Sequence, residues 1–411
     1  MSARVCDLGS LMPVDEAIRR LLDQAPPPPP GQMIDLDQAL GRVLACDIHS
    51  PVNLPAWDNS AMDGYALRAA DLPAEGGWLP LGGRIAAGDQ AGSPLLAQQT
   101  VQIFTGAPLP SGADTVVPQE RCRVEGERVC FPAVSSGDHV RKLGEEVRRG
   151  DLLLQAGKRL RAQEVGLLAG AGIARVEVYR PLQVCLLSSG NELREPGEAL
   201  APGQIYNSNR HCLAALLRGW GVEVHDYGVM ADELAASRHA LSLASSECDL
   251  LLSSGGVSVG GEDHLKQAIE ELGRIDFWRL AIQPGKPLAF GDVAGKPWIG
   301  MPGNPSAALI TALVVVRPLL LRAQGVTDVL PLPLSVPAGF DWLQRNKRRQ
   351  YLRARLIPGT DGQLRVELHP QQSSAMLTAA CWADGLAVIE CEQQVQKHDN
   401  VMFLSFADLM H

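Results

Sequence analysis

The chain has 411 residues, of which 46 are acidic and 37 are basic, so its formal net charge at pH 7 is −9. A nucleic-acid partner would require concentrated lysine and arginine to neutralise phosphates, and we therefore expect none. Hydrophobic residues make up 46% of the chain and charged residues 20%, a composition typical of globular proteins. The length predicts roughly two to four domains, each able to bury a core.

The chain shows no sequence signal for export or for a membrane. Its first residues lack the apolar segment of a signal peptide. The most apolar run, 307–321, is shorter than the ~20 residues that span a bilayer, and Arg317 and Pro318 interrupt it. The nine cysteines are scattered without a CxxC pair, which indicates reduced thiols rather than disulfides or a zinc site. We therefore expect a cytoplasmic protein that does not bind membranes.

The first part of the chain is predicted to hold two domains, one inserted into the other. A helix at 12–24 ends at five prolines, Pro26–Pro30, which favour a stiff polyproline II spacer. Short β-like runs punctuated by glycine and proline fill 51–149 and indicate an inserted β-rich domain. Helical spacing returns after this insertion, so residues 1–50 and 150–180 are assigned to one α+β linker domain.

Strands and helices alternate through residues 181–326. This alternation predicts an α/β domain with a mostly parallel, doubly wound sheet that helices cover on both faces. Residues 327–411 return to short strands, which indicate a small C-terminal β-barrel domain. In the α/β domain the predicted strands are 184–187, 222–227, 250–252 and 275–282, with short strands near Leu288 and Trp298, and the predicted helices are 210–219, 233–246, 264–272 and 306–323.

Three loops rich in glycine, serine and proline each follow an apolar strand of this domain. The first is SSGGVSVGGED, and exposed backbone N–H groups in such a loop suit an anionic ligand. We therefore expect Gly255, Gly256 and Ser258 to bind substrate and Asp263 to hold a metal ion beside bound phosphate. A tight turn with Asp263 as a helix N-cap is the alternative. The three loops are residues 253–263, 283–287 and 301–305.

Other polar residues of the α/β domain also lie at predicted strand ends. Glu192 fits a metal or ligand residue and an acid at a helix N-terminus equally well. Asp232 fits an N-cap residue, although its place after a strand leaves a functional role open. Lys286 lies between prolines that fix where its ammonium group points, which suits an oxyanion. Asn304 lies in PGNP, whose amides would contact a ligand or simply turn the chain into the next helix.

The segment PAWDNSAMDGYA is the most unusual one in the β-rich domain. Asp58, Asn59, Ser60 and Asp63 place two acids, an amide and a hydroxyl within six residues. Taken alone, Asx-type and hairpin turns explain them best. The chain has no Walker A loop, GxSxG elbow or HExxH motif, and no GxGxxG follows a strand. The commonest nucleotide, serine-hydrolase and zincin sites are therefore excluded.

Seven motifs, in their order along the chain, resemble those of the MoeA-type molybdopterin molybdenumtransferases, which are related to the E domain of gephyrin. The resemblance covers essentially the whole chain, and DNSAMDGYA together with GGVSVG is highly specific. It implies an elongated homodimer of four-domain subunits, with residues 181–326 as the molybdopterin-binding domain. The motifs are DNSAMDGYA (58–66), FTGAPLP (104–110), SSGNEL (188–193), GQIYNSNR (203–210), SSGGVSVG (253–260), PGKP (284–287) and MPGNP (301–305).

The resemblance also implies a reaction: molybdate is inserted into the dithiolene of adenylylated molybdopterin, AMP is released, and Mg²⁺ is required. Asp63 and Thr105 of one subunit would complete a site on the α/β domain of the other. A molybdopterin adenylyltransferase and molybdoenzymes or their chaperones are the expected partners. The implied catalytic residues are Asp63, Glu192, Asp232, Asp263 and Lys286; the implied substrate-binding residues are Thr105, Gly255, Gly256, Ser258, Arg279, Pro302, Asn304 and Pro305; Asp263 and Glu192 would hold the metal.

Several positions depart from the family pattern. Gln283 stands where a lysine is common, and Arg279 replaces a strand lysine, which keeps the charge but changes the geometry. Arg279 is the expected molybdate-binding cation. Asn191 and Glu146 replace an acidic residue and an aspartate, and Tyr206–Asn209 replaces YDxN. A molybdopterin-binding carrier or scaffold with weak or no transferase activity is therefore a second hypothesis. A CinA-like nucleotide-processing enzyme is a third, which the DNSAMDGYA domain argues against.

Overall fold

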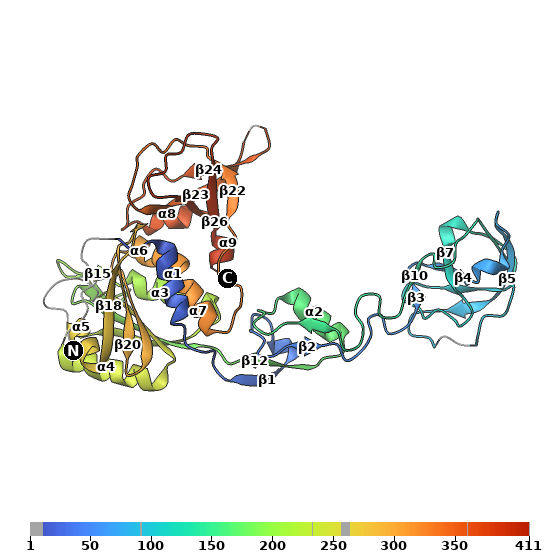
Figure 1. Ribbon diagram of the computed structural model, residues 1–411, viewed down its shortest axis with the longest axis horizontal. Coiled ribbons are helices and arrows are strands. Elements are labelled where there is room, and N and C mark those ends of the chain that lie inside the picture. The colour runs from blue at the N-terminus through green and yellow to red at the C-terminus, as the bar shows by residue number, and fades with distance from the viewer. Residues whose placement is uncertain (1–10, 91–92, 232, 256–263, 360, 411) are drawn as a thin grey trace. The chain divides into compact units, whose positions relative to one another are not determined.

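The computed structural model describes residues 11–90, 93–231, 233–255, 264–359 and 361–410. The chain divides into two compact units, whose elements are coloured by residue number in Figure 1. The first unit comprises the residues up to Gln32, Gly41–Val43 and Val178–His411, and the second comprises Met33–Leu40 and Leu44–Glu177. The second unit is therefore inserted in the sequence of the first.

The first unit contains a six-stranded sheet in the order β16-β13-β17-β21-β20-β18. The pairs β16–β13, β13–β17 and β17–β21 are parallel, as the alternation of strands and helices predicts. β20 is antiparallel to both β21 and β18, so β18 runs in the same direction as the parallel strands. The carboxyl ends of five strands therefore lie at one edge. The strands are β13 Gln183–Ser189, β16 Glu223–Met230, β17 Leu250–Ser254, β18 Gly273–Arg279, β20 Pro287–Val293 and β21 Lys296–Met301.

Helices cover both faces of this sheet (Figure 1). Side chains alternate between the faces of a strand. Leu250 and Leu252 of β17 therefore pack in one core with α1, α3 and the long helix that follows β21, whereas Leu251 packs in the other core with α4 and α5. α1, which the predicted boundaries assign to the linker domain, contributes Ala17 and Leu21 to the first core. The helices are α1 Val14–Asp23, α3 Ser208–Gly219, α4 Leu234–Glu247 and α5 His264–Leu272.

The long helix after β21 contains a π-helical turn. It consists of α6 Pro305–Thr311, the π turn η4 Ala312–Val316 and α7 Arg317–Ala323. Pro318 lacks the N–H donor of a regular helix, and the π turn before it accommodates this loss. By length and composition alone Pro305–Ala323 could cross a membrane, but 94% of its apolar window is buried inside the protein. A core helix passes the same test.

Two stretches of the α/β sequence fold differently from the prediction. The predicted strand 275–282 is wrong as one element, because β18 ends at Arg279 and Ile282–Gln283 form β19, which pairs with a strand of the C-terminal sheet. Between them, the N–H of Ala281 donates to the carbonyl of Met12 at 2.7 Å. The short strands predicted near Leu288 and Trp298 are full strands of a hairpin, β20–β21. An apolar run shows that a strand forms but not which sheet it joins.

The C-terminal sheet has the order β19-β23-β25-β26-β22, and β24 pairs with β23. A bridge between Ala338 and Val366 links the chain after β22 to β24. Leu352, Phe403 and Val366 fill its core. Two short helices here were not predicted. The elements are β22 Leu334–Pro337, β23 Arg349–Pro358, β24 Leu364–Leu368, α8 Leu377–Trp382, β25 Gly385–Ile389, β26 Asn400–Ser405 and α9 Phe406–Leu409.

The second unit is rich in strands and contains a six-stranded sheet in the order β7-β4-β6-β5-β9-β8. Its pairs are antiparallel except β5–β6. Tyr65 and Phe131 pack edge to face in its core. Two strands, β1 Gly31–Asp35 and β12 Arg175–Tyr179, cross the sequence boundaries between the units. The other elements are η1 Leu36–Gln38, β2 Ile48–His49, β3 Asn59–Ser60, β4 Gly64–Leu67, η2 Ala69–Asp71, β5 Gly77–Ile85, β6 Thr100–Ile103, β7 Thr115–Pro118, η3 Gln119–Arg121, β8 Arg123–Glu125, β9 Arg128–Phe131, β10 Val140–Arg141, β11 Leu152–Leu154 and α2 Ala162–Gly170.

Candidate active site

The first glycine loop begins at the carboxyl end of β17, between the ends of β13 and β21. Gly255 follows the strand with φ +85°, and an added Cβ would lie 2.4 Å from the carbonyl oxygen of Ser189. Only glycine fits such a turn without displacing backbone. Four predicted site residues lie outside the described residues: Asp232, Gly256, Ser258 and Asp263.

Asn209, near the start of α3, ties this loop to the MPGNP loop. Its Nδ2 donates to Oγ of Ser254 at 2.9 Å and to the carbonyl of Gly303 at 2.8 Å. Its own Oδ1 and the hydroxyl of Ser188 are buried and lack a hydrogen-bond partner among the described residues. Buried polar atoms without partners cost free energy. The strand ends therefore offer hydrogen-bonding groups to a ligand or to water.

Glu192 lies on the segment that leaves β13. Its carbonyl accepts a hydrogen bond from the N–H of Ile205 at 2.8 Å, next to the pairing of β14 Leu193–Arg194 with β15 Ile205–Tyr206. The side chain is exposed, and no described residue forms an ion pair with its carboxylate. The alternative of an acid at a helix N-terminus is wrong, because a strand follows. A fixed backbone with a free carboxylate suits a ligand-binding residue.

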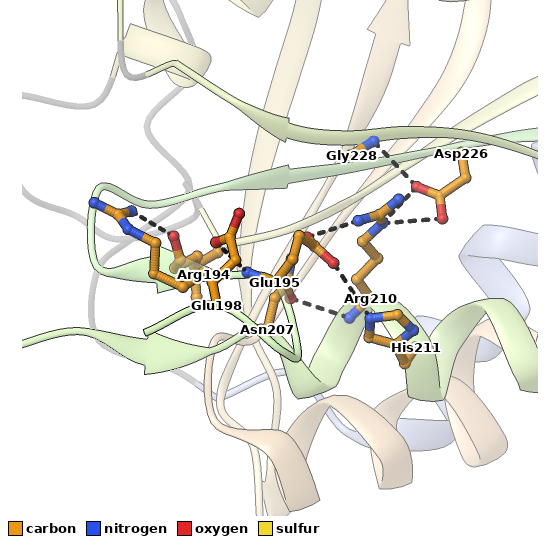
Figure 2. Close-up of polar contacts among 9 residues, drawn as sticks. Arg194, Glu195, Glu198, Asn207, Arg210, His211, Asp226 and Gly228 are labelled. Atoms are coloured by element: carbon orange, nitrogen blue, oxygen red, sulfur yellow. Dashed lines mark hydrogen bonds and ion pairs between the residues drawn. The ribbon is translucent and has the colours of Figure 1, made fainter. Parts of the chain in front are cut away.

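Arg210 anchors this segment to β16, as Figure 2 shows. Its Nε donates to both oxygens of Asp226 at 2.8 and 2.9 Å, and its Nη1 lies 2.6 Å from Oε1 of Glu195. Nε2 of His211 lies 3.4 Å from the other oxygen of Glu195. The hydrogen bond to Asp226 is the main cause of the raised pKa of Arg210. Arg210 therefore holds in place the segment that carries Glu192.

The PGKP loop presents Lys286 to solvent beside α6. Gly285 has φ +99°, and an added Cβ would lie 3.0 Å from Oγ1 of Thr311, so the loop packs closely on α6. The ammonium group of Lys286 has no carboxylate partner within the described part of the chain. Arg279, the predicted molybdate-binding cation, ends β18, and its carbonyl accepts a hydrogen bond from Met12 at 2.8 Å. No observation tests its predicted role.

Arg353 on β23 is a candidate that sequence reasoning missed. Its side chain is 0% exposed, and its Nη2 donates to the carbonyl of Ser373 at 3.1 Å. Nε and Nη1 are buried without a partner among the described groups. Burial lowers its pKa to about 10. A buried cation without a counter-charge is unfavourable unless an anion joins it. The available signal was an arginine at a core position of an apolar strand, YLRARLI.

Two hydroxyls of α6 share this property with Arg353. Oγ of Ser306 and Oγ1 of Thr311 are buried, and neither has a partner among the residues described. The N–H of Ser306 donates to the carbonyl of Ser374 at 3.0 Å, next to the residue that accepts from Arg353. We call Arg353, Ser306 and the backbone of Ser373 and Ser374 the Arg353 cluster; Thr311 lies instead beside Gly285 of the PGKP loop. The Arg353 cluster lies where α6 meets the C-terminal sheet.

The MPGNP loop leads directly into α6. Pro302 is buried, and Pro305 occupies the first turn of the helix, where its missing N–H has no cost. Asn304 is exposed at the N-cap position, but its side chain makes no capping hydrogen bond. Its amide is therefore not required by the helix and stays accessible to a ligand.

In the second unit, Asp63 and Thr105 contact each other. Oδ1 of Asp63 accepts hydrogen bonds from the backbone N–H and the hydroxyl of Thr105, both at 2.8 Å. These bonds lower the pKa of Asp63, the backbone bond most. Asp58 instead accepts from the N–H of Leu143 at 2.8 Å and from Lys142 at 3.1 Å. The side chain of Asp58 therefore ties its segment to residues 142–143 and does not form the predicted Asx-type turn, whereas Asp63 is exposed and held in one orientation.

The described residues supply few of the ligands that a metal ion needs. They contain no cluster of three or more His, Cys, Asp or Glu side chains that could hold one. Mg²⁺, however, commonly takes one or two carboxylates and completes its shell with waters and substrate phosphates. The free carboxylate of Glu192 fits this pattern.

Three family models match consecutive parts of the chain. "MoeA N-terminal region (domain I and II)" matches residues 12–172, "Probable molybdopterin binding domain" matches 185–322, and "MoeA C-terminal region (domain IV)" matches 335–406. The three matches cover both units and follow the order of domains that the sequence motifs imply.

Proteins that are similar over most of the chain are named molybdopterin molybdenumtransferases. The molybdopterin molybdenumtransferase of Haemophilus influenzae is 36% identical over 386 residues, 93% of this chain and 95% of that protein. The Nostoc enzyme of that name is 38% identical over 72% of this chain and 70% of its own. A crystal structure of the molybdopterin biosynthesis MoeA protein from Pyrococcus horikoshii, 30% identical, superposes with a TM-score of 0.75 and covers 97% of this chain and 99% of that one. The chain therefore belongs to the MoeA family and is a molybdopterin molybdenumtransferase of molybdenum cofactor biosynthesis.

Proposed function

We propose that this transferase inserts molybdate into the dithiolene of adenylylated molybdopterin and releases AMP. The observation that carries the proposal is the Arg353 cluster. Molybdate is a tetrahedral oxyanion. Two guanidinium nitrogens of Arg353 and the hydroxyl of Ser306, which have no partner among the described residues, are buried donors for its oxygens. Charge-assisted hydrogen bonds of this kind are about twice as strong as neutral ones.

The pterin and its phosphates are assigned to the carboxyl edge of the six-stranded sheet. The turn at Gly255, which packs against the carbonyl of Ser189, would present its backbone to a ligand, and Lys286 would supply a cation for phosphate oxygens. Asn304 has a free amide for the pterin. α6 connects this edge with the Arg353 cluster, so pterin and molybdate would meet along one helix.

Mg²⁺ is assigned to Glu192 together with Asp263. When bound, the ion supplies charge neutralisation at the phosphoanhydride that is cleaved as AMP leaves. Glu192 contributes a carboxylate whose backbone β14 and β15 fix. Arg210 limits the movement of the same segment through Glu195 and Asp226.

A partner subunit is proposed to complete the site. Asp63 faces solvent, and two hydrogen bonds from Thr105 orient its carboxylate. Without a ligand, these two bonds would only stabilise a turn on the surface. We therefore assign Asp63 to the ligand of a second copy of the chain, in a homodimer. The substrate requires a molybdopterin adenylyltransferase as supplier and molybdoenzymes or their chaperones as recipients, and we place the reaction in the cytoplasm.

The proposal is tested by AMP release from adenylylated molybdopterin with and without molybdate and Mg²⁺. Release by the wild-type enzyme should require both. Glu192→Gln and Asp263→Ala should each reduce the rate by about 10²-fold or more, the effect of losing one electrostatic stabiliser. AMP release at a rate that does not depend on molybdate would contradict the proposed reaction. Wild-type rates in both variants would contradict only the assignment of the metal ligands.

A further inference from the structure

Gln283 connects the PGKP loop to a basic run in the C-terminal part of the chain. Its Oε1 accepts hydrogen bonds from Nδ2 of Asn346 at 2.7 Å and from Nη2 of Arg348 at 3.0 Å. β19, which contains Gln283, pairs with β23 in parallel, with Gln283 opposite Gln350. The same backbone pairing therefore brings the run 345–349 to the loop that carries Lys286.

The cations of this run differ in how their charges are compensated. Arg349 lies 2.6 Å from Asp15 and 2.8 Å from Glu390. Arg348, the adjacent residue, forms no ion pair with any described carboxylate, although it is half-buried. Among the described residues, its guanidinium donates to the neutral amide of Gln283, which orients the group and does not balance its charge.

Arg348 and Lys286 thus lie on two loops that the pairing of β19 with β23 connects, and neither forms an ion pair with a described carboxylate. Like charges near each other repel, and an anion that binds between them removes that cost. A guanidinium group has five N–H donors. In Arg348 only the Nη2 nitrogen donates to Gln283. The remaining donors can bind two oxygens of a tetrahedral anion at once.

We propose that Arg348 is a further substrate-binding residue, which Gln283 positions so that it binds the oxyanion together with Lys286. This inference rests on the proposed function and deepens it, since it adds Arg348 to the cations that bind molybdate besides Arg353, and it lets Lys286 contact molybdate as well as the phosphates. Gln283 acts through its carbonyl oxygen and is a positioning residue. A lysine at position 283 could not accept the hydrogen bond from Arg348, but it would bring a cation of its own to the same place.

The test uses the full-length enzyme and measures AMP release over a range of molybdate concentrations, and molybdate binding by equilibrium dialysis. Arg348→Ala should raise the apparent KM and the Kd for molybdate about tenfold, which corresponds to about 1.4 kcal/mol, with a smaller change in kcat. Arg345→Ala is the matched control, because Arg345 is an exposed residue of the same run that contacts Gln394 at 3.3 Å. It should behave as the wild type.

A double variant that moves the positive charge from position 348 to position 283 gives a sharper test. Adding Gln283→Lys to Arg348→Ala should restore most of the molybdate affinity, whereas adding Gln283→Ala should not. Unchanged molybdate KM and Kd in Arg348→Ala would overturn the inference, as would failure of Gln283→Lys to improve on the single variant. Both outcomes leave the proposed reaction standing if the wild type releases AMP only with molybdate.

Discussion

Replacement of Arg353 by methionine should stabilise the protein while it removes the activity. Burial lowers the pKa of Arg353 from the ordinary guanidinium value to about 10, so the charged form is disfavoured in the folded state by about 3 kcal/mol. The hydrogen bond to the carbonyl of Ser373 offsets about 1 kcal/mol of this burial cost. Arg353→Met should therefore raise the free energy of unfolding by about 1–3 kcal/mol, since methionine fills a similar volume without a charge to desolvate.

The pH dependence has a definite sign. Arg353 is charged in both the folded and the unfolded chain at neutral pH, so the burial cost is fully present below about pH 10. This cost is relieved only as the pH rises from the folded pKa of about 10 toward the higher pKa of the unfolded chain. The stability difference between variant and wild type should consequently be constant between pH 6 and about pH 9.

The activity should change in the opposite direction. Loss of the guanidinium removes a buried electrostatic contact to the oxyanion, and kcat/KM for molybdate should fall about 10²–10³-fold. Unfolding by denaturant and AMP release are measured on the same preparations, with molybdate added to each. Molybdate should stabilise the wild type but not the variant.

Arg355→Met provides the control on the same strand. Arg355 is only partly buried, donates to the carbonyl of Trp382 at 2.8 Å and lies over the Trp382 ring at 4.0 Å. Its replacement should cost stability and leave molybdate use intact. Two results would refute the hypothesis that Arg353 is a buried cation that binds molybdate. One is a variant Arg353→Met that is less stable than the wild type, and the other is a variant that molybdate still stabilises.

Three further predictions concern the strand ends and the second unit. Asn209→Ala should lower the free energy of unfolding by about 2 kcal/mol, because hydrogen bonds to Ser254 and Gly303 are lost; tryptophan fluorescence in urea measures this, and no change would mean that the two loops are held otherwise. Gly255→Ala should reduce AMP release by about tenfold or more, since its Cβ would approach a carbonyl at 2.4 Å, while Gly166→Ala in α2, with nothing within 4 Å, should be silent. Thr105→Val should raise the pKa of Asp63, which Thr105 lowers; carboxyl NMR titration would show it, and an unmoved pKa would mean that the backbone N–H alone sets it.

Much of the fold could be predicted from local patterns in the sequence. Alternation of apolar strands and amphipathic helices identified β13, β17 and α3–α5 close to their observed bounds, because both periodicities are properties of short segments. Glycines such as Gly255 were recognisable for the same reason, since the need for a positive φ is local. The sequence of the glycine loops therefore suffices to predict an anionic ligand.

The contacts that complete the site depend on the tertiary structure. The sequence predicts Ile282–Gln283 as the end of one long strand. In the structure these residues form β19, which joins the C-terminal sheet and brings Arg348 to the PGKP loop. Arg353 is separated by about fifty residues from Ser306 in the sequence, and only the packing of α6 against that sheet buries both without partners. Burial and the absence of a counter-charge are properties of the assembled surroundings. The sequence by itself determined which segments bind anions; the packing of the two sheets decided which cations are left uncompensated to do so.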